Sequence, residues 1–310
     1  MTQSERLGNM QPGIPQEIEG TPLRRFNEML ERRQEEGLFI CFGLDPDLKR
    51  YGEYFELPEM DTDDPNGELS DFLYVRGMEY VEATSEFAAV YKPNAGFYEQ
   101  YGLAGVGALH NIVNDIKEDH PEIPVIGDVK RGDIGNTQEA YARAAFKDYG
   151  FDAATVNGYI GEDAVKPFTD YEEKGTYVLV RTSNPSAAET QNRIMDDGKP
   201  YWKHIAELVA KKWNEKGNVS IVIGATNPQE LSEVREIVGP KMQILAPGVG
   251  TQGGSVKDVV AAGNDRFVIN VSRSHLYPKL QEGETLQDAI KRVSQDLHDE
   301  ITEERAKLEA

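Results

Sequence analysis

Eight short apolar segments recur along the chain, and stretches with helical spacing separate most of them. The segments are four to seven residues long, and nearly every position within them is apolar. Strands of this kind are buried on both faces, as in a parallel sheet that helices cover. The predicted strands are Leu38–Leu44, Ala88–Tyr91, Pro124–Val129, Ala153–Val156, Tyr177–Val180, Val219–Ile223, Gln243–Ala246 and Phe267–Val271.

Segments with helical periodicity connect these strands. The predicted connecting helices are Leu73–Phe87, Gly105–Lys117, Thr137–Tyr149, Trp202–Lys216, Pro228–Val238 and Ser255–Ala262. The alternation predicts an α/β protein, a (β/α)8 TIM barrel formed as a single domain. A doubly wound open sheet is the main alternative. That fold normally carries a Gly-rich turn after an early strand, whereas the first strand here ends Phe42-Gly-Leu-Asp-Pro-Asp.

Both ends of the chain and one connection lie outside the regular alternation. Residues 1–20 are polar and contain Gly and Pro, which predicts a loosely ordered leader before a barrel domain of residues 21–310. A first helix is expected over Thr21–Glu36 and a closing helix over Thr285–Leu308. The acidic, Pro-rich stretch from about residue 46 to 70 is interpreted as an insertion in the first strand-to-helix connection.

Composition argues against several classes of function. No apolar run approaches the roughly 18 residues of a membrane span, and a net charge of −21 disfavours binding to nucleic acid or anionic lipid. The first residues lack a secretory signal pattern, so we expect a cytoplasmic protein. The single cysteine, Cys41, lies in an apolar run and is expected to be a buried core residue.

The sequence contains no pattern for a resident metal or a hydrolase nucleophile. Its five histidines show neither H-x-H nor H-E-x-x-H spacing, and one cysteine cannot build a zinc cluster. Neither a G-x-S-x-G motif nor a Walker sequence is present. An anionic ligand would therefore have to be bound by Lys, Arg and backbone N–H groups.

Polar residues follow the predicted strands at the end where barrels carry their chemistry. They are Asp45, Lys92 with Asn94, Asp128 with Lys130, Asn157, Thr182 with Ser183, Pro247–Gly254, and Ser272 with Arg273. Each has an ordinary structural explanation as a turn former, a strand end or a surface charge. Their common position at one rim of the barrel instead indicates a binding site.

Two of these segments predict an anion site. The loop Pro247–Gly254 contains four glycines, which let backbone N–H groups approach a ligand closely. Arg273 follows the next strand and can make a bidentate contact with an anion. Barrels often bind phosphate with the loops after strands seven and eight, so a phosphate site is predicted here.

The stretch Asp128–Thr137 concentrates charge at the end of the third strand. Because side chains alternate along a strand, Asp128 and Lys130 should point to one side and Val129 to the other. Ionised groups at such a position need either water or neutralising partners. The pattern alone leaves two interpretations open, a solvated turn with incidental ion pairs and a functional array of charges.

The ordered set of motifs strongly resembles the orotidine 5′-phosphate decarboxylase family. The resemblance rests on Asp128-x-Lys130-x-x-Asp133-Ile134-x-Asn136-Thr137, with Asp45 and Lys92 upstream and the Pro247–Gly254 and Arg273 segments downstream. Lys92-Pro-Asn-Ala-Gly-Phe-Tyr-Glu and Arg181-Thr-Ser-Asn-Pro are similar to the longer, type 2 subgroup. The matching motifs extend from about residue 38 to 275, which is nearly the whole predicted barrel.

The resemblance implies removal of CO₂ from C6 of the orotate ring to give uridine 5′-phosphate in de novo pyrimidine synthesis, without a metal or organic cofactor. The carbanion left at C6 cannot delocalise into the ring, so the site must stabilise charge electrostatically. By resemblance, Lys130 is the cation near C6 and its proton donor, and Asp128 faces the departing carboxylate. Lys92 and Asp133 complete an array of alternating charge.

The resemblance also implies the substrate contacts and a partner. Asp45 is expected to hold the ribose, Ser183 the pyrimidine edge, and Gln252 to bridge phosphate and ring. The phosphate site is expected to comprise Pro247, Gly250, Gly253 and Arg273. Asp133 and Thr137 are expected to reach into a neighbouring subunit's site, with ribose hydroxyls as the target of Thr137, which implies a homodimer with shared active sites.

Other functions remain open at this point. A barrel aldolase would use Lys130 or Lys92 as a Schiff-base nucleophile, but flanking carboxylates favour the ammonium form, which is not nucleophilic. A non-catalytic uridine-nucleotide-binding module would bind uridine 5′-phosphate without turnover. A β-keto acid decarboxylase on the same scaffold would normally depend on a metal and would lose activity on chelation.

Overall fold

A barrel of eight parallel strands forms the centre of the computed structural model, which describes residues 25–59, 64–250 and 253–309. The sheet order is β2-β1-β8-β7-β6-β5-β4-β3, and parallel bridges from Tyr91 to Val125 and from Asn94 to Asp128 close it between β2 and β3. The predicted (β/α)8 TIM barrel is therefore confirmed. The strands are β1 Ile40–Leu44, β2 Ala88–Pro93, β3 Ile126–Arg131, β4 Ala153–Val156, β5 Gly175–Arg181, β6 Val219–Ile223, β7 Ile244–Pro247 and β8 Phe267–Val271.

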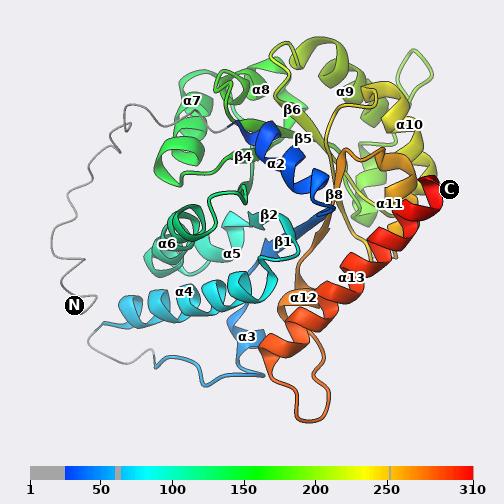
Figure 1. Ribbon diagram of the computed structural model, residues 1–310. Helices are drawn as coiled ribbons and strands as arrows, with labels where there is room; N and C mark the ends of the chain where they lie inside the picture. Colours follow the sequence, from blue (N-terminus) through cyan, green and yellow to red (C-terminus); the bar gives the residue numbers. More distant parts are fainter. Residues whose placement is uncertain (1–24, 60–63, 251–252, 310) are drawn as a thin grey trace.

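Helices surround the strands (Figure 1). The α-helices are α2 Phe26–Glu35, α3 Leu48–Tyr51, α4 Pro65–Thr84, α5 Ala95–Glu99, α6 Gly102–Asp119, α7 Gly135–Arg143, α8 Glu162–Thr169, α9 Tyr201–Leu208, α10 Pro228–Val238, α11 Val256–Gly263, α12 Arg273–Leu276 and α13 Leu286–Glu309. Short 3₁₀ turns cover Gly158–Ile160 and Pro185–Glu189. The closing helix α13 packs beside α4 and α11 on the outside of the barrel.

Several helices differ from the sequence-based expectation: α3, α5 and α12 are short and were not predicted, and α4 and α8 differ for identifiable reasons. Helix α4 begins at Pro65, although its apolar periodicity predicted a start at Leu73. The Asp64 carboxylate accepts a hydrogen bond from the N–H of Gly67 (2.9 Å), and Pro65 occupies the first helical position, so the Pro-rich stretch ends in a helix start. Helix α8 was not among the predicted helices, because it is short and contains Pro167.

The predicted helices after β3 and β5 end in a wider turn. Helix α7 continues as a π-helical turn over Ala144–Asp148, and α9 continues in the same way over Val209–Trp213. Both predicted segments are thus helical throughout most of their length. A change of hydrogen-bond pattern within one helix leaves the apolar spacing almost unchanged, so the sequence alone does not reveal it.

Helix α2 lies across the strands and contributes to the inner core of the barrel (Figure 1). The ring of Phe26 packs edge-on against Tyr177, with 5.8 Å between centroids, and Gln34 donates a hydrogen bond to the carbonyl of Phe267. Both partners lie in the first half of their strands, so α2 covers the amino-terminal end of the barrel. Cys41 belongs to this inner core and is fully buried, as predicted. The predicted leader, residues 1–20, lies outside the described residues.

Two properties of the described part of the chain bear on function. None of its helices combines the length and the apolar character that a membrane span requires. Within the same residues, no group of three or more His, Cys, Asp or Glu side chains is arranged to hold a metal ion.

Candidate active site

A cavity of about 470 Å³ opens at the carboxyl ends of the strands. Leu179, Val222 and Leu245 from β5, β6 and β7 are among its apolar lining residues, and polar side chains from the other strand ends surround them. The predicted site residues that line the cavity are Asp45, Lys92, Asp128, Lys130, Ser183, Pro247 and Arg273. Residues more than 200 positions apart in the sequence therefore meet in one cavity, because parallel strands place their carboxyl ends at the same rim.

Asp128 lies at the centre of a charged cluster in this cavity. Its Oδ2 accepts a hydrogen bond from Lys92 Nζ at 2.8 Å, and its Oδ1 accepts one from Lys130 Nζ at 2.5 Å. Lys92 and Asp128 are buried, whereas the side chain of Lys130 is about half exposed. The sequence-based expectation that Asp128 and Lys130 point to the same side is confirmed.

Burial opposes charge on both members of the inner pair, but their neighbours outweigh it. Burial alone would lower the pKa of Lys92, yet the carboxylates of Asp128 and Asp45 raise it above its ordinary value. Burial alone would raise the pKa of Asp128, yet the ammonium groups of Lys92 and Lys130 hold it well below its usual range. Lys92 and Asp128 are therefore both ionised at neutral pH.

The backbone at Lys130 adopts an unusual conformation. Its φ angle is +44°, in the left-handed region that residues with a side chain rarely occupy. Gly127 pairs with Ala154, and Arg131 pairs with Val156. An advance of four residues along β3 therefore corresponds to an advance of two residues along β4. A bulge of this kind bends the end of a strand, and here the Lys130 side chain still contacts Asp128.

Thr155 of β4 is a site residue that the sequence analysis missed. Its hydroxyl donates to Asp128 Oδ1 (3.0 Å) and accepts from the main-chain N–H of Lys130 (2.9 Å). The available signal was a lone polar residue in the otherwise apolar run Ala153–Val156. A buried Thr in a strand is common, so that signal has little specificity. Other lining residues that were not predicted as ligands include Phe97, Asn270 and Ser274.

Asp45 follows β1, which pairs with β2, the strand that carries Lys92. Its Oδ2 accepts a hydrogen bond from Ser272 Oγ at 2.6 Å, whereas its Oδ1 has no hydrogen-bond partner among the described residues. The Tyr277 hydroxyl accepts from the N–H of Asp47 (2.7 Å) and thereby fixes the chain just beyond. Asp45 lines the cavity, and a carboxylate in such a place suits a ligand that carries hydroxyl groups.

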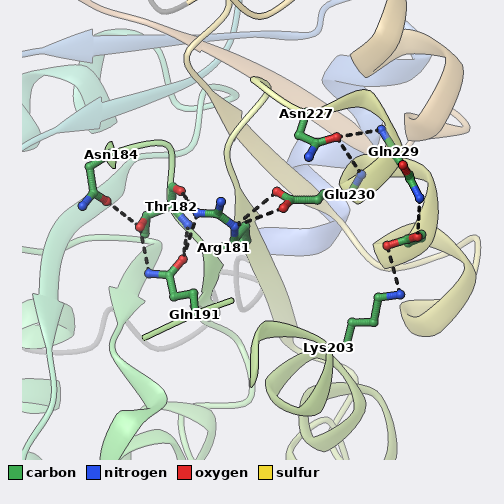
Figure 2. A network of polar contacts seen from close by, with 9 residues as sticks. Arg181, Thr182, Asn184, Gln191, Lys203, Asn227, Gln229 and Glu230 are labelled. Carbon is green, nitrogen blue, oxygen red and sulfur yellow. Dashed lines mark hydrogen bonds and ion pairs between the residues drawn. The ribbon is translucent and has the colours of Figure 1, made fainter. Parts of the chain in front are cut away.

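A polar network fixes the segment that follows β5 (Figure 2). The Gln191 side chain accepts from the N–H of Thr182 and donates to the Thr182 hydroxyl, both at 2.8 Å. Arg181 forms an ion pair with Glu230 of α10 (3.2 Å), and neither side chain is more than 15% exposed. These contacts hold Thr182 and its neighbour Ser183 at the cavity wall.

The Gly-rich loop after β7 folds back on itself. Gly248, Gly250 and Gly253 have φ angles of +101°, +72° and +85°, which a side chain would strain. The N–H of Gly250 donates to the carbonyl of Gly254, and that of Gly253 donates to the carbonyl of Gly250. Neither glycine lines the cavity, so a bound anion would have to replace these internal hydrogen bonds. Gln252 lies outside the described residues.

Asp133 and Thr137 stand apart from the cavity of their own chain. Asp133 Oδ1 accepts from the N–H of Ile134 (2.8 Å), and the Asp133 N–H donates to the Gln138 side chain (2.9 Å). Thr137 is exposed at the start of α7. Within one chain, the charged array therefore contains Lys92, Asp128 and Lys130 but not Asp133.

Fold and cavity together define a (β/α)8-barrel protein with a small-molecule site of paired lysine and aspartate side chains. The Orotidine 5′-phosphate decarboxylase / HUMPS family matches residues 40–274 of the chain. The orotidine 5′-phosphate decarboxylase of Herpetosiphon aurantiacus is 42% identical over 256 residues, which cover 83% of this chain and 90% of that protein. The chain belongs to this family.

Two further relatives support the assignment. The orotidine 5′-phosphate decarboxylase of Thermomicrobium roseum is 43% identical over 259 residues, covering 81% of this chain and 86% of that protein. The solved structure of the Leishmania donovani OMP decarboxylase aligns with a TM-score of 0.75 at 30% identity, covering 90% of this chain and 98% of the other.

Proposed function

We propose that the protein decarboxylates orotidine 5′-phosphate to uridine 5′-phosphate and CO₂, and that Lys130 supplies the proton. The C6–carboxylate bond breaks, its electron pair stays on C6, and the Lys130 ammonium protonates that carbon. The observation that carries the proposal is the Lys92–Asp128–Lys130 cluster inside the cavity. An ammonium fixed beside the reacting carbon stabilises the developing carbanion without reorganisation of solvent.

Asp128 and Lys92 prepare the charge of the site. Asp128 remains ionised because two ammonium groups surround it, and in our proposal it faces the substrate carboxylate. Repulsion between the two carboxylates is relieved as CO₂ departs. Lys92 neutralises Asp128 from the buried side, which leaves Lys130 as the more exposed cation.

The remainder of the nucleotide would occupy the cavity walls. We assign the ribose to Asp45 and the pyrimidine edge to Ser183, because both residues line the cavity. Arg273 would bind the phosphate together with Pro247, Gly250, Gln252 and Gly253, after the loop releases its internal hydrogen bonds. Binding energy from a distant phosphate can then contribute to the chemical step.

We further propose a homodimer in which Asp133 and Thr137 complete the partner's site. Neither residue lines the cavity of its own chain. Exposed apolar side chains lie beside them, since Ile134 is 56% exposed and Tyr159 and Ile160 are 78% and 46% exposed. The N–H of Asn157 donates to the carbonyl of Arg131, which places this apolar group on adjoining strand ends and suits a subunit interface.

Lysine chemistry of the Schiff-base type is disfavoured by the same geometry. The aldolase reaction needs a neutral lysine, whereas the Asp128 carboxylate stabilises the ammonium form of Lys92. Failure of borohydride to trap a covalent adduct is the expected result.

We place the enzyme in the cytoplasm, because its one cysteine can form no internal disulfide.

Replacement of the proposed proton donor tests the mechanism. Lys130→Ala should reduce kcat by about 10⁴-fold or more, because both the cation and the proton are lost. Binding of uridine 5′-phosphate, measured by calorimetry, should persist because the phosphate and ribose contacts remain. Near-normal turnover by this variant would rule out Lys130 as the proton donor.

A further inference from the structure

Thr155 contacts both Asp128 and Lys130, the two proposed catalytic residues of β3. It lies on β4 and is fully buried. Its hydroxyl donates its one proton to Asp128 Oδ1 at 3.0 Å and accepts the main-chain N–H of Lys130 at 2.9 Å. A threonine hydroxyl has a single proton, so Thr155 has no donor left for the substrate.

The main-chain N–H of Lys130 needs a hydrogen-bond acceptor such as the Thr155 hydroxyl. A φ of +44° is unfavourable for lysine and persists only where surrounding contacts impose it. The bulge between Gly127 and Arg131 removes the regular pairing of β3 with β4 at this point. The side chain of Thr155 therefore replaces a sheet contact, because it receives the Lys130 N–H that the regular ladder would have paired.

The same hydroxyl acts on the carboxylate. Asp128 Oδ1 accepts from both Thr155 Oγ1 and Lys130 Nζ, while Oδ2 accepts from Lys92. With three donors on its two oxygens, Asp128 cannot rotate without losing a hydrogen bond. Thr155 thus constrains Lys130 through its main chain and Asp128 through its side chain.

We propose that Thr155 is a positioning residue, which holds the Lys130 ammonium and the Asp128 carboxylate in the correct place relative to the reacting carbon of the substrate. The inference rests on the proposed role of Lys130 as proton donor. Without the hydroxyl, the Lys130 backbone is free to leave the left-handed region, and the 2.5 Å contact between Nζ and Asp128 Oδ1 loosens. The chemical step should suffer, whereas nucleotide binding should not.

Three variants test this role. Thr155→Val keeps the shape of the side chain and removes the hydroxyl, while Thr155→Ser keeps the hydroxyl. Thr176→Val is the matched control, because Thr176 is a fully buried strand threonine whose hydroxyl has no hydrogen-bond partner among the described residues. For each variant, kcat, KM, affinity for uridine 5′-phosphate and melting temperature are measured.

The expected pattern separates positioning from packing. Thr155→Val should lower kcat about 100-fold, the scale of a misplacement near 1 Å, with KM and nucleotide affinity within about threefold of the parent. Thr155→Ser should restore kcat to within about fivefold, and Thr176→Val should leave it unchanged. If Thr155→Val does not fold, Thr155→Ala takes its place, and its kcat should fall far below that of Thr155→Ser.

Two outcomes would overturn the inference. A kcat of the hydroxyl-free variant within about threefold of the parent would mean that the hydroxyl does not position the reacting groups. Equal losses in Thr155→Ser and Thr155→Val would assign the effect to packing of the methyl group. Failure of the proposed role of Lys130 would be distinguishable from these outcomes. In that case Lys130→Ala would retain turnover, whatever residue occupies position 155.

Discussion

At the scale of single residues, the buried ion pair of Lys92 and Asp128 predicts a large effect on stability. Asp128→Asn keeps the size of the side chain but leaves Lys92 buried without its hydrogen-bonded counter-charge. We expect the free energy of unfolding at pH 7 to fall by roughly 3–5 kcal/mol, the usual cost of breaking a buried ion pair from one side. Urea denaturation of parent and variant measures the difference.

The sign of the pH dependence follows from the lowered pKa of Asp128. A carboxyl whose pKa is lower in the folded state stabilises the fold above the unfolded value, near pH 4, and loses this contribution as the pH falls. The stability advantage of the parent over Asp128→Asn should therefore shrink in acid. Glu99→Gln, which breaks the exposed pair with Arg131, is the control and should cost less than about 1 kcal/mol. Equal losses in both variants would contradict this account.

The sequence predicted some features of these residues and not others. Alternation along a strand is a local property, so it correctly placed Asp128 and Lys130 on the same side. The left-handed backbone of Lys130 and the contacts of Thr155 depend on a bulge against β4. That bulge is a property of strand pairing, and no pattern within β3 indicates it.

At the scale of elements, the segment between β5 and α9 gives the sharpest prediction. Gln191→Ala removes both hydrogen bonds to Thr182 and should free the adjoining Ser183. Because Ser183 is proposed to hold the ring before and during reaction, KM should rise about tenfold with a smaller change in kcat. Steady-state kinetics with orotidine 5′-phosphate measures both constants.

The network in Figure 2 also supplies the control for this prediction. The Gln229 side chain donates a hydrogen bond to Glu233 on the exposed face of α10, away from Thr182. Gln229→Ala should therefore leave KM unchanged. An unchanged KM in Gln191→Ala, or an equal rise in both variants, would show that the network does not position Ser183.

The strands were the easiest elements to predict. All eight lie within a few residues of their expected positions, because burial on both faces makes their apolar runs continuous. Helix boundaries were harder. The start of α4 depends on the Asp64 cap and on Pro65, residues that equally indicate a loop.

At the scale of the whole molecule, the proposed sharing of active sites between subunits predicts complementation. Asp133→Ala and Lys130→Ala should each be nearly inactive alone. After subunit exchange in an equal mixture, half of the dimers pair one variant with the other, and each mixed dimer contains one intact site. Activity should therefore recover to roughly a quarter of the parent value. No recovery, with exchange demonstrated by differently tagged subunits, would argue against sharing.

The barrel could be predicted from the chain itself, whereas the proposed sharing of the site between subunits could not. The barrel follows from eight repeated strand and helix units, and its rim follows from the direction of the strands. The position of Asp133 outside its own cavity is a property of the folded chain, and only the family resemblance suggested it beforehand.

The most direct test of the central claim is the ultraviolet absorbance of orotidine 5′-phosphate after addition of purified, chelator-treated protein. We expect a rapid fall in absorbance with stoichiometric release of CO₂, and the same rate before and after chelation. A stable absorbance, from folded protein that still binds uridine 5′-phosphate, would mean that the barrel and its nucleotide site were correctly identified and that the chemistry was not.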